Sequence, residues 1–473
     1  MSREARRRRG PPGFFVTGAA TFAGKDGIAN GDAAVPAFRN LPAKLFTMRN
    51  NTPSRNETTP TALPVRRGPF YALGFRNFRL FFFGQMISVA GSWMQSVAEQ
   101  WLIFSLTHSA AWLGIVAGSS ALPYVAFTMW GGQVADRFSR RTILVVTQGA
   151  ALLLAVLLAV LASNRVVRIQ PWHVAALAGL LGVVNAFNVP AQQAFVTDMI
   201  DGSDALPNAI ALNSFQFNIA RVIGPIIAGS VLVSLGVPWC FGLNALSFAA
   251  VILSLLLMRL PPHKLREVGD RASSLWEGFR YIGRSPSVLR IIMMVGFGSM
   301  LLWSIWTLYP VFAERYHQGP KGFSRMMTAN GIGAATGGIL VAAFGERLSR
   351  RHLIYGGAAL FALTMIAMTL APSFPVLLCC LVFSGLCMML LGVNANTRIQ
   401  QEVPNRLRGR VMAVYSLVFG GLMPFGGLTI GFLAKHIGAP EAVRIYAGIA
   451  LVAAISLFLW SEFDRRPRLP EMS

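Results

Sequence analysis

Two ionisable side chains lie inside apolar runs that are long enough to cross a bilayer. Glu99 falls in a run that starts near residue 78, and Arg221 falls in a run that ends near residue 235. A charge at the centre of a bilayer costs roughly 2.5–3.5 kcal/mol, so each needs a compensating role. We expect the two to pair in one state, with Glu99 taking up a proton when Arg221 turns away. A permanent structural ion pair, or a Glu99 hydrated near the outer surface, is the alternative.

Polar side chains recur along several of these runs. In the first run they follow steps of three and four residues, which places them on one helix face. A polar face in lipid is costly, so it should line a cavity or form a hydrogen-bonded seam with another helix. The candidate cavity residues are Gln85, Ser88, Ser92 and Gln95, then Asn185, Asn188 and Gln192, and finally Asn394, Thr397 and Gln401.

Two further patterns bear on ligand binding and on helix contacts. Trp303 and Trp306 would stack a flat ligand, or else belong to an aromatic belt at the membrane surface. Gly224 and Pro225, with Gly229 after them, form a helix-packing motif. Proline removes a backbone donor there, and the small residues permit close approach of a second helix.

The composition indicates which elements must hold these residues. The 473 residues are 54% hydrophobic and 13% charged, whereas soluble domains carry about 25% charged residues. A membrane-spanning helix needs roughly 20 mostly apolar residues, and such runs recur along the chain. We therefore predict an all-α membrane protein with twelve transmembrane helices, at about 78–103, 110–133, 142–163, 172–197, 206–235, 239–259, 288–313, 323–345, 351–371, 374–400, 407–435 and 441–462.

The formal net charge of +23 suggests nucleic-acid binding at first sight. However, the Lys and Arg residues concentrate in alternate loops and in the N-terminal segment, which is the pattern that orients membrane proteins. We therefore expect both termini in the cytoplasm and no nucleic-acid partner. The four cysteines all lie in apolar runs and match neither a zinc site nor a disulfide framework.

The chain divides into five predicted parts. A disordered basic cytoplasmic tail, residues 1–70, precedes an N-terminal six-helix half at 71–259. A cytoplasmic linker at 260–287 leads to a C-terminal six-helix half at 288–463, and residues 464–473 form a second cytoplasmic tail. Residues 1–47 have no sustained periodicity and too few apolar residues for a core. We expect residues 1–47 to be dispensable, and Met48 is a candidate for the true start of translation.

The two halves carry the same landmarks at nearly the same spacing. Acid, Arg, apolar, Ser, Arg, Arg occurs at 136–141 and again at 346–351, 210 positions later in the numbering. Val-Asn-Ala occurs at 184–186 and again at 393–395. Two unrelated landmarks at matching offsets indicate an internal duplication. Parallel six-helix repeats bind substrate between them and alternate access by rocking.

Gly132, Asp136, Arg137, Arg140 and Arg141 together resemble the loop signature of the major facilitator superfamily, although Ser139 stands where the pattern usually has Gly. This resemblance implies the major facilitator fold, with a central substrate path and a gate at the inner side. The residues of the second copy are Glu346, Arg347, Arg350 and Arg351. Arginines in such loops can also serve only as topology anchors.

The runs at 190–195 and 206–209 resemble the branch that contains the enterobactin exporter and macrolide efflux proteins. The resemblance implies an antiporter of a bacterial inner membrane, with proton-coupled efflux of a small amphipathic or aromatic molecule such as a drug-like compound or siderophore. The alternatives are a lysophospholipid or solute transporter, and a receptor or scaffold on the same fold. We expect no enzyme activity, no cofactor and no metal. The expected partners are a small-molecule substrate, protons and the lipid bilayer, and we expect a monomer.

Overall fold

Long helices follow one another with short connections. The computed structural model describes residues 68, 70–200, 205–259, 271–345 and 347–463, and all of them belong to one compact unit within residues 66–473. Residues 1–67 and 69 of the predicted tail, residues 201–204, the first part of the linker at 260–270, Glu346 and residues 464–473 lie outside the described residues. No strand occurs in the described part of the chain.

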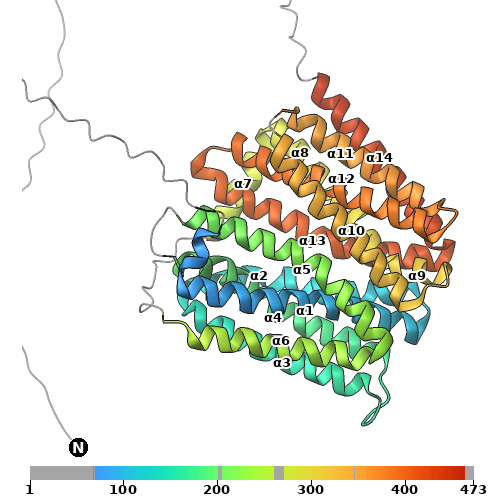
Figure 1. Ribbon diagram of the computed structural model, residues 1–473. Helices are drawn as coiled ribbons and strands as arrows, with labels where there is room; N and C mark the ends of the chain where they lie inside the picture. The colour runs from blue at the N-terminus through green and yellow to red at the C-terminus, as the bar shows by residue number, and fades with distance from the viewer. Residues whose placement is uncertain (1–67, 69, 201–204, 260–270, 346, 464–473) are drawn as a thin grey trace, which may run out of the picture. The chain divides into compact units, whose positions relative to one another are not determined.

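The first half contains a short 3₁₀ helix, η1 (Tyr71–Gly74), and six long helices (Figure 1). Each begins and ends within a few residues of its predicted span. They are α1 (Arg76–Thr107), α2 (Ala110–Arg137), α3 (Arg140–Ala162), α4 (Pro171–Asp198), α5 (Leu206–Ser234) and α6 (Val237–Leu257).

The second half repeats this plan with one broken span. It contains α10 (Gly319–Phe344), α11 (Arg350–Thr369), α12 (Phe374–Glu402), α13 (Asn405–Ile437) and α14 (Ala439–Phe463). The seventh predicted span consists of α8 (Pro286–Phe297), a π-helical turn η2 (Gly298–Leu302), a 3₁₀ turn η3 (Trp303–Leu308) and α9 (Tyr309–Arg315). Before it lies the amphipathic helix α7 (Arg271–Arg284), which packs on α13.

Eleven helices among the described residues are long and apolar enough to cross a membrane, with the broken span counted as one. Helix α1 is not among them, because its polar stripe lowers its mean hydropathy. It is nevertheless 32 residues long and packs lengthwise against α5 and α6. Helix α1 therefore completes the predicted twelve-helix bundle.

The same helix pairings recur in both halves, which confirms the two six-helix repeats. In the first half α2 packs on α4, and α3 packs on α4 and α6. The corresponding pairs in the second half are α10 with α12, and α11 with α12 and α14. Even one side-chain contact repeats: Arg141 donates to the Leu256 carbonyl at 2.9 Å, and Arg351 donates to the Phe458 carbonyl at 3.2 Å.

The halves meet along two helix pairs, α2 with α13 and α5 with α10. We call the end of the bundle that carries α7 and the α2–α3 turn the linker end, and the opposite end the far end. The halves pack most closely toward the far end. A β-carbon added to Gly431 of α13 would lie 2.6 Å from the Ala110 carbonyl oxygen, and one added to Gly114 would lie 2.7 Å from the Gly427 oxygen.

Candidate substrate cavity

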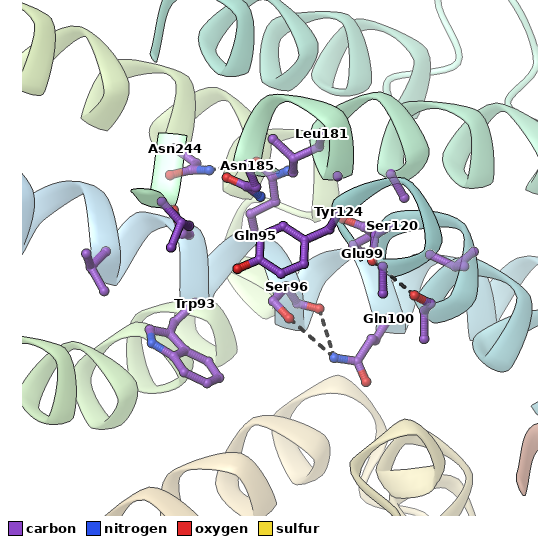
Figure 2. Close-up of a pocket in the computed structure, with 18 of the residues that line it drawn as sticks. Trp93, Gln95, Ser96, Glu99, Gln100, Ser120, Tyr124, Leu181, Asn185 and Asn244 are labelled. Atoms are coloured by element: carbon purple, nitrogen blue, oxygen red, sulfur yellow. Dashed lines mark hydrogen bonds between the residues drawn. The ribbon is translucent and has the colours of Figure 1, made fainter. Parts of the chain in front are cut away.

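The polar face of α1 lines a cavity of about 660 Å³ between the helices. Figure 2 shows side chains from several elements converging on this space, among them Gln95 and Glu99 of α1 and Tyr124 of α2. The predicted residues that line it are Gln85, Ser88, Ser92, Gln95, Glu99, Asn185, Asn188, Gln192 and Trp306. The helical periodicity of α1 therefore brings most of the predicted polar residues together.

Part of this polar surface is also a hydrogen-bonded seam, so both sequence-based alternatives occur. Gln95 accepts from the Asn244 amide of α6 at 2.7 Å. Asn188 of α4 accepts from the Thr147 hydroxyl of α3 at 3.0 Å. By contrast, the Nε2 atom of Gln85 is buried without a hydrogen-bond acceptor among the described residues.

A second cavity, of about 540 Å³, is lined mainly by aromatic and methionine side chains. Trp303 is buried between Phe361 and Phe419, with ring centroids 5.7 and 5.1 Å away, so it does not lie in a surface belt. Trp306 and Trp93 line both cavities, which places the two spaces next to each other. The full lining is Trp93, Phe217, Arg221, Trp303, Trp306, Met388, Met389, Gly392, Val393, Asn396, Thr397, Tyr415, Phe419 and Met423.

Glu99 and Arg221 lie in different cavities and do not form an ion pair in this conformation. Glu99 lines the larger cavity and makes no hydrogen bond or ion pair with any residue that the structure describes. Arg221 is 6% exposed and donates through Nη2 to the Asn330 side-chain oxygen at 2.7 Å. Its guanidinium carbon also lies 4.7 Å from the Trp306 ring centroid. The ion pair stays a prediction for another conformation.

Two candidate residues lie outside the lining of both cavities. Asn394 is fully buried in α12, where its amide donates to the Leu390 carbonyl, and Gln401 is exposed near the end of the same helix. Conversely, the sequence analysis missed several lining residues. Ser120 and Tyr124, four positions apart on α2, show the same helical spacing as the α1 stripe and could have been found by it.

The charged loop residues gather at the linker end, and their contacts described here stay within one half. Gly132, Asp136 and Arg137 lie in the last turns of α2, and α3 begins at Arg140. Arg140 pairs with Asp198 of α4 at 2.5 Å.

The second half has a comparable arrangement. Arg350 and Arg351 begin α11, and Arg351 pairs with Glu462 of α14 at 2.5 Å. Arg347 lies over the Phe344 ring at 5.6 Å, while Glu346 lies outside the described residues.

The helix-packing motif of α5 lies against α1 of its own half and against α10 of the other half. A β-carbon on Gly224 would lie 2.7 Å from the Ala90 carbonyl oxygen of α1, and one on Gly229 would lie 2.6 Å from the Ser324 hydroxyl of α10. The Ser324 hydroxyl also donates to the Pro225 carbonyl, so it links the two halves. Together with the Arg221–Asn330 bond, this contact holds the halves together between the middle of the bundle and its far end.

Comparison with family models gives a match to the family described as transmembrane secretion effector, over residues 67–470. The chain is 24% identical over 400 residues to a staphyloferrin A transporter of Staphylococcus aureus, covering 83% of this chain and 98% of that protein. It is 24% identical over 420 residues to the multidrug efflux pump Tap of Mycolicibacterium fortuitum, covering 86% and 98%. It is 26% identical over 403 residues to the enterobactin exporter EntS of Escherichia coli, covering 83% and 94%.

Solved structures share the fold at lower identity. A bacterial homologue of the human lysosomal transporter Spinster, in an inward-facing and unoccupied conformation, matches with a TM-score of 0.64 and 17% identity, covering 82% of this chain and 97% of that one. The nucleoside transporter NupG matches with a TM-score of 0.59 and 15% identity, covering 82% and 99%.

Proposed function

We propose that this chain, which belongs to the transmembrane secretion effector family, exports a small amphipathic or aromatic molecule from the cytoplasm. The chain is a multi-pass membrane transporter of the major facilitator type, and its family and relatives are transporters rather than enzymes. The relatives named for staphyloferrin A, for multiple drugs and for enterobactin support a siderophore or drug-like cargo.

One observation carries this proposal: a polar cavity and an aromatic cavity adjoin each other between two halves that are closed at the far end. The larger space offers amides and hydroxyls together with Glu99, while the smaller one offers indole and phenyl faces. A molecule with one polar and one flat apolar part fits such a pair of spaces. Because the halves pack most closely toward the far end, we infer that the substrate enters from the linker end and leaves after the halves rock.

The distribution of positive charge supports placing the linker end and both termini in the cytoplasm. The bacterial relatives support a bacterial inner membrane, where we propose that the chain works as a monomer. Glu99 is the proposed proton carrier, since it is the acid in the polar cavity. The charged loops at the linker end, with Asp136 and Arg137 foremost, are the proposed inner gate.

The test is flux in proteoliposomes that contain the purified full-length chain. A pH gradient is imposed, and movement is followed for a panel of aromatic drugs, a siderophore and a lysophospholipid. We expect the gradient to drive movement of an aromatic compound or of the siderophore. Flux of lysophospholipid alone would favour lipid transport, and no flux of any compound would favour a receptor or scaffold. Both outcomes would contradict the proposal.

A further inference from the structure

Arg221 is a buried cation whose protein partners are all neutral. Its Nη2 atom donates to Asn330 at 2.7 Å and contacts the Met388 sulfur at 3.5 Å. The rings of Trp306 and Trp93 lie 4.7 and 5.9 Å from its guanidinium carbon. Among the residues that the structure describes, no Asp or Glu pairs with it. A buried cation is normally paired with an acid, because burial removes its hydration.

The acceptor for Arg221 is held in place as a neutral amide. Asn330 is 1% exposed, and its Nδ2 atom donates to the Ser384 hydroxyl at 2.9 Å. That hydroxyl in turn donates to the Leu381 carbonyl at 2.8 Å. This chain of hydrogen bonds turns the Asn330 oxygen toward Arg221 and supplies no negative charge. The positive charge of Arg221 therefore remains uncompensated by its neighbours.

Hydrogen-bond donors are also left over at this place. A guanidinium has five N–H donors in a planar fork, and the Nε and Nη1 atoms of Arg221 donate to no described residue. The indole Nε1 of Trp306, which stacks near Arg221, is buried without an acceptor. Both side chains line the aromatic cavity. Unused donors beside an uncompensated positive charge call for a ligand that brings an anionic acceptor.

We propose that Arg221 is the counter-charge for an acidic group of the transported molecule, so that the substrate is an aromatic or otherwise flat carboxylate. Its acid binds Arg221, and its flat part lies among the Trp303, Trp306 and Phe419 rings. Glu99 lines only the other cavity, so it does not face this acid. This inference rests on the proposed export function and names the substrate class for it.

The site also places the acid where it affects the contact between the halves. Arg221 belongs to α5 of the first half, whereas Asn330 belongs to α10 of the second. A carboxylate on the unused Nε and Nη1 donors would bind the same guanidinium that Asn330 holds through Nη2. Binding therefore acts on an arginine whose contacts with Asn330 and Met388 join the two halves.

Equilibrium binding of 2-naphthoate and 2-naphthamide to the purified full-length chain tests the proposal. The two probes have nearly the same size and shape, and only naphthoate is an anion. We expect the parent to bind naphthoate about tenfold more tightly or better, as a charge-assisted pair would give. Naphthoate that fails to bind, or that binds no more tightly than naphthamide, overturns the proposal.

Two variants locate the charge, and one serves as a matched control. Asn330→Asp keeps the size of the side chain and gives Arg221 an internal acid, so the preference for naphthoate should fall to about onefold. Arg221→Gln should have the same effect. If the Arg221→Gln protein does not fold, the result for Asn330→Asp decides whether Arg221 binds the acid. Arg325→Gln removes an exposed arginine of α10 and should leave the preference unchanged. A preference that persists in Asn330→Asp contradicts the proposal.

The ratio of the naphthoate and naphthamide affinities separates this inference from a purely structural latch and from the export function itself. A purely structural latch would alter the affinities for both probes equally, because neither probe would contact Arg221. Export itself is measured by flux, not by binding. Flux of naphthamide without any naphthoate preference would therefore leave the export function in place and remove the anion site.

Discussion

At the scale of single residues, the two ionisable side chains inside the bundle lie in different spaces, and we propose a different task for each. Glu99 faces a cavity of amides and hydroxyls, and Arg221 faces a cavity of aromatic rings. An acid in a space lined by amides and hydroxyls can exchange its proton as the two halves rock. A guanidinium stacked on indoles keeps its charge, since arginine remains protonated in proteins. We therefore propose proton exchange at Glu99 and anion binding at Arg221.

The first prediction concerns Glu99→Gln. This variant should still bind substrate, because the amide keeps the size and the hydrogen-bonding capacity of the side chain. It should lose proton-coupled flux, because an amide does not titrate. The measurement is substrate flux against a pH gradient in proteoliposomes, combined with equilibrium binding to the same preparation.

The matched control is Glu441→Gln. This variant neutralises an exposed acid in the first turn of α14, at the far end of the bundle, that pairs with Arg444. It should transport like the parent. The double variant Glu99→Gln with Arg221→Gln tests a purely structural ion pair, which would leave coupling intact once both charges are gone. Retained proton coupling in a folded Glu99→Gln protein would end the carrier hypothesis.

The second prediction concerns Asp136→Asn at the linker end. The fold should persist, and transport should fall by about tenfold, because losing a charge-assisted contact of about 1.5–3 kcal/mol shifts a two-state balance by that factor or more. The measurement is flux at matched expression. Glu346→Gln, in the repeated loop, should lower flux less, since that loop departs further from the family signature. Equal flux in Asp136→Asn and the parent would contradict a gating role.

At the scale of helices, close backbone contact between α2 and α13 closes the far end. Gly431 has no room for a side chain: a β-carbon there would lie 2.6 Å from the Ala110 carbonyl and 3.1 Å from the Gly114 α-carbon. Backbone atoms cannot rotate away as a flexible side chain can. The closed far end therefore depends on this glycine.

The third prediction is that Gly431→Ala shifts the protein toward a conformation that is open at the far end. Overpacking costs about 1–3 kcal/mol, which is enough to change the balance of two states by about fivefold or more. Spin labels at Ser109→Cys and Lys435→Cys, in a background without the native cysteines, report the distance between the halves. The distribution should gain a longer component.

The control for this experiment is Gly448→Ala on α14, where an added β-carbon meets no atom within 4 Å. Its distance distribution should match the parent. A Gly431→Ala protein with an unchanged distribution and normal flux would show that the far end tolerates the methyl group. The role assigned to this contact would then be wrong.

Apolar length and helical periodicity are local properties, and they explain which helices could be predicted. Every predicted span has a helical counterpart within a few residues, and the amphipathic segment after the first half is α7. The break at η2 and η3 could not be predicted in this way, because tertiary contacts accompany it. A β-carbon on Gly426 of α13 would lie 1.9 Å from the Met300 carbonyl oxygen in η2.

At the scale of the whole molecule, features within one half could be predicted from the sequence, whereas contacts between the two halves could not. The α1 stripe was predictable because its members repeat along one helix. The partner of Arg221 was not, because Asn330 lies 109 positions away in the other half. The internal repeat gives no information on contacts between the halves, because the helix pairings that recur all lie within one half.

The last prediction concerns residues 1–47, which lie outside the described residues and before the family match that begins at residue 67. Deleting them should leave membrane insertion and flux unchanged, because the helices that form the cavities all lie later in the chain. The rival role is a basic tether to anionic lipid, worth about 1 kcal/mol per basic residue near the surface. A full-length variant with Arg6, Arg7, Arg8 and Arg9 changed to Gln tests that role directly. Membrane fractionation and proteoliposome flux are measured for both variants. A deletion variant that inserts normally but loses flux would contradict dispensability, and the same loss in the Gln variant would assign it to the arginine cluster.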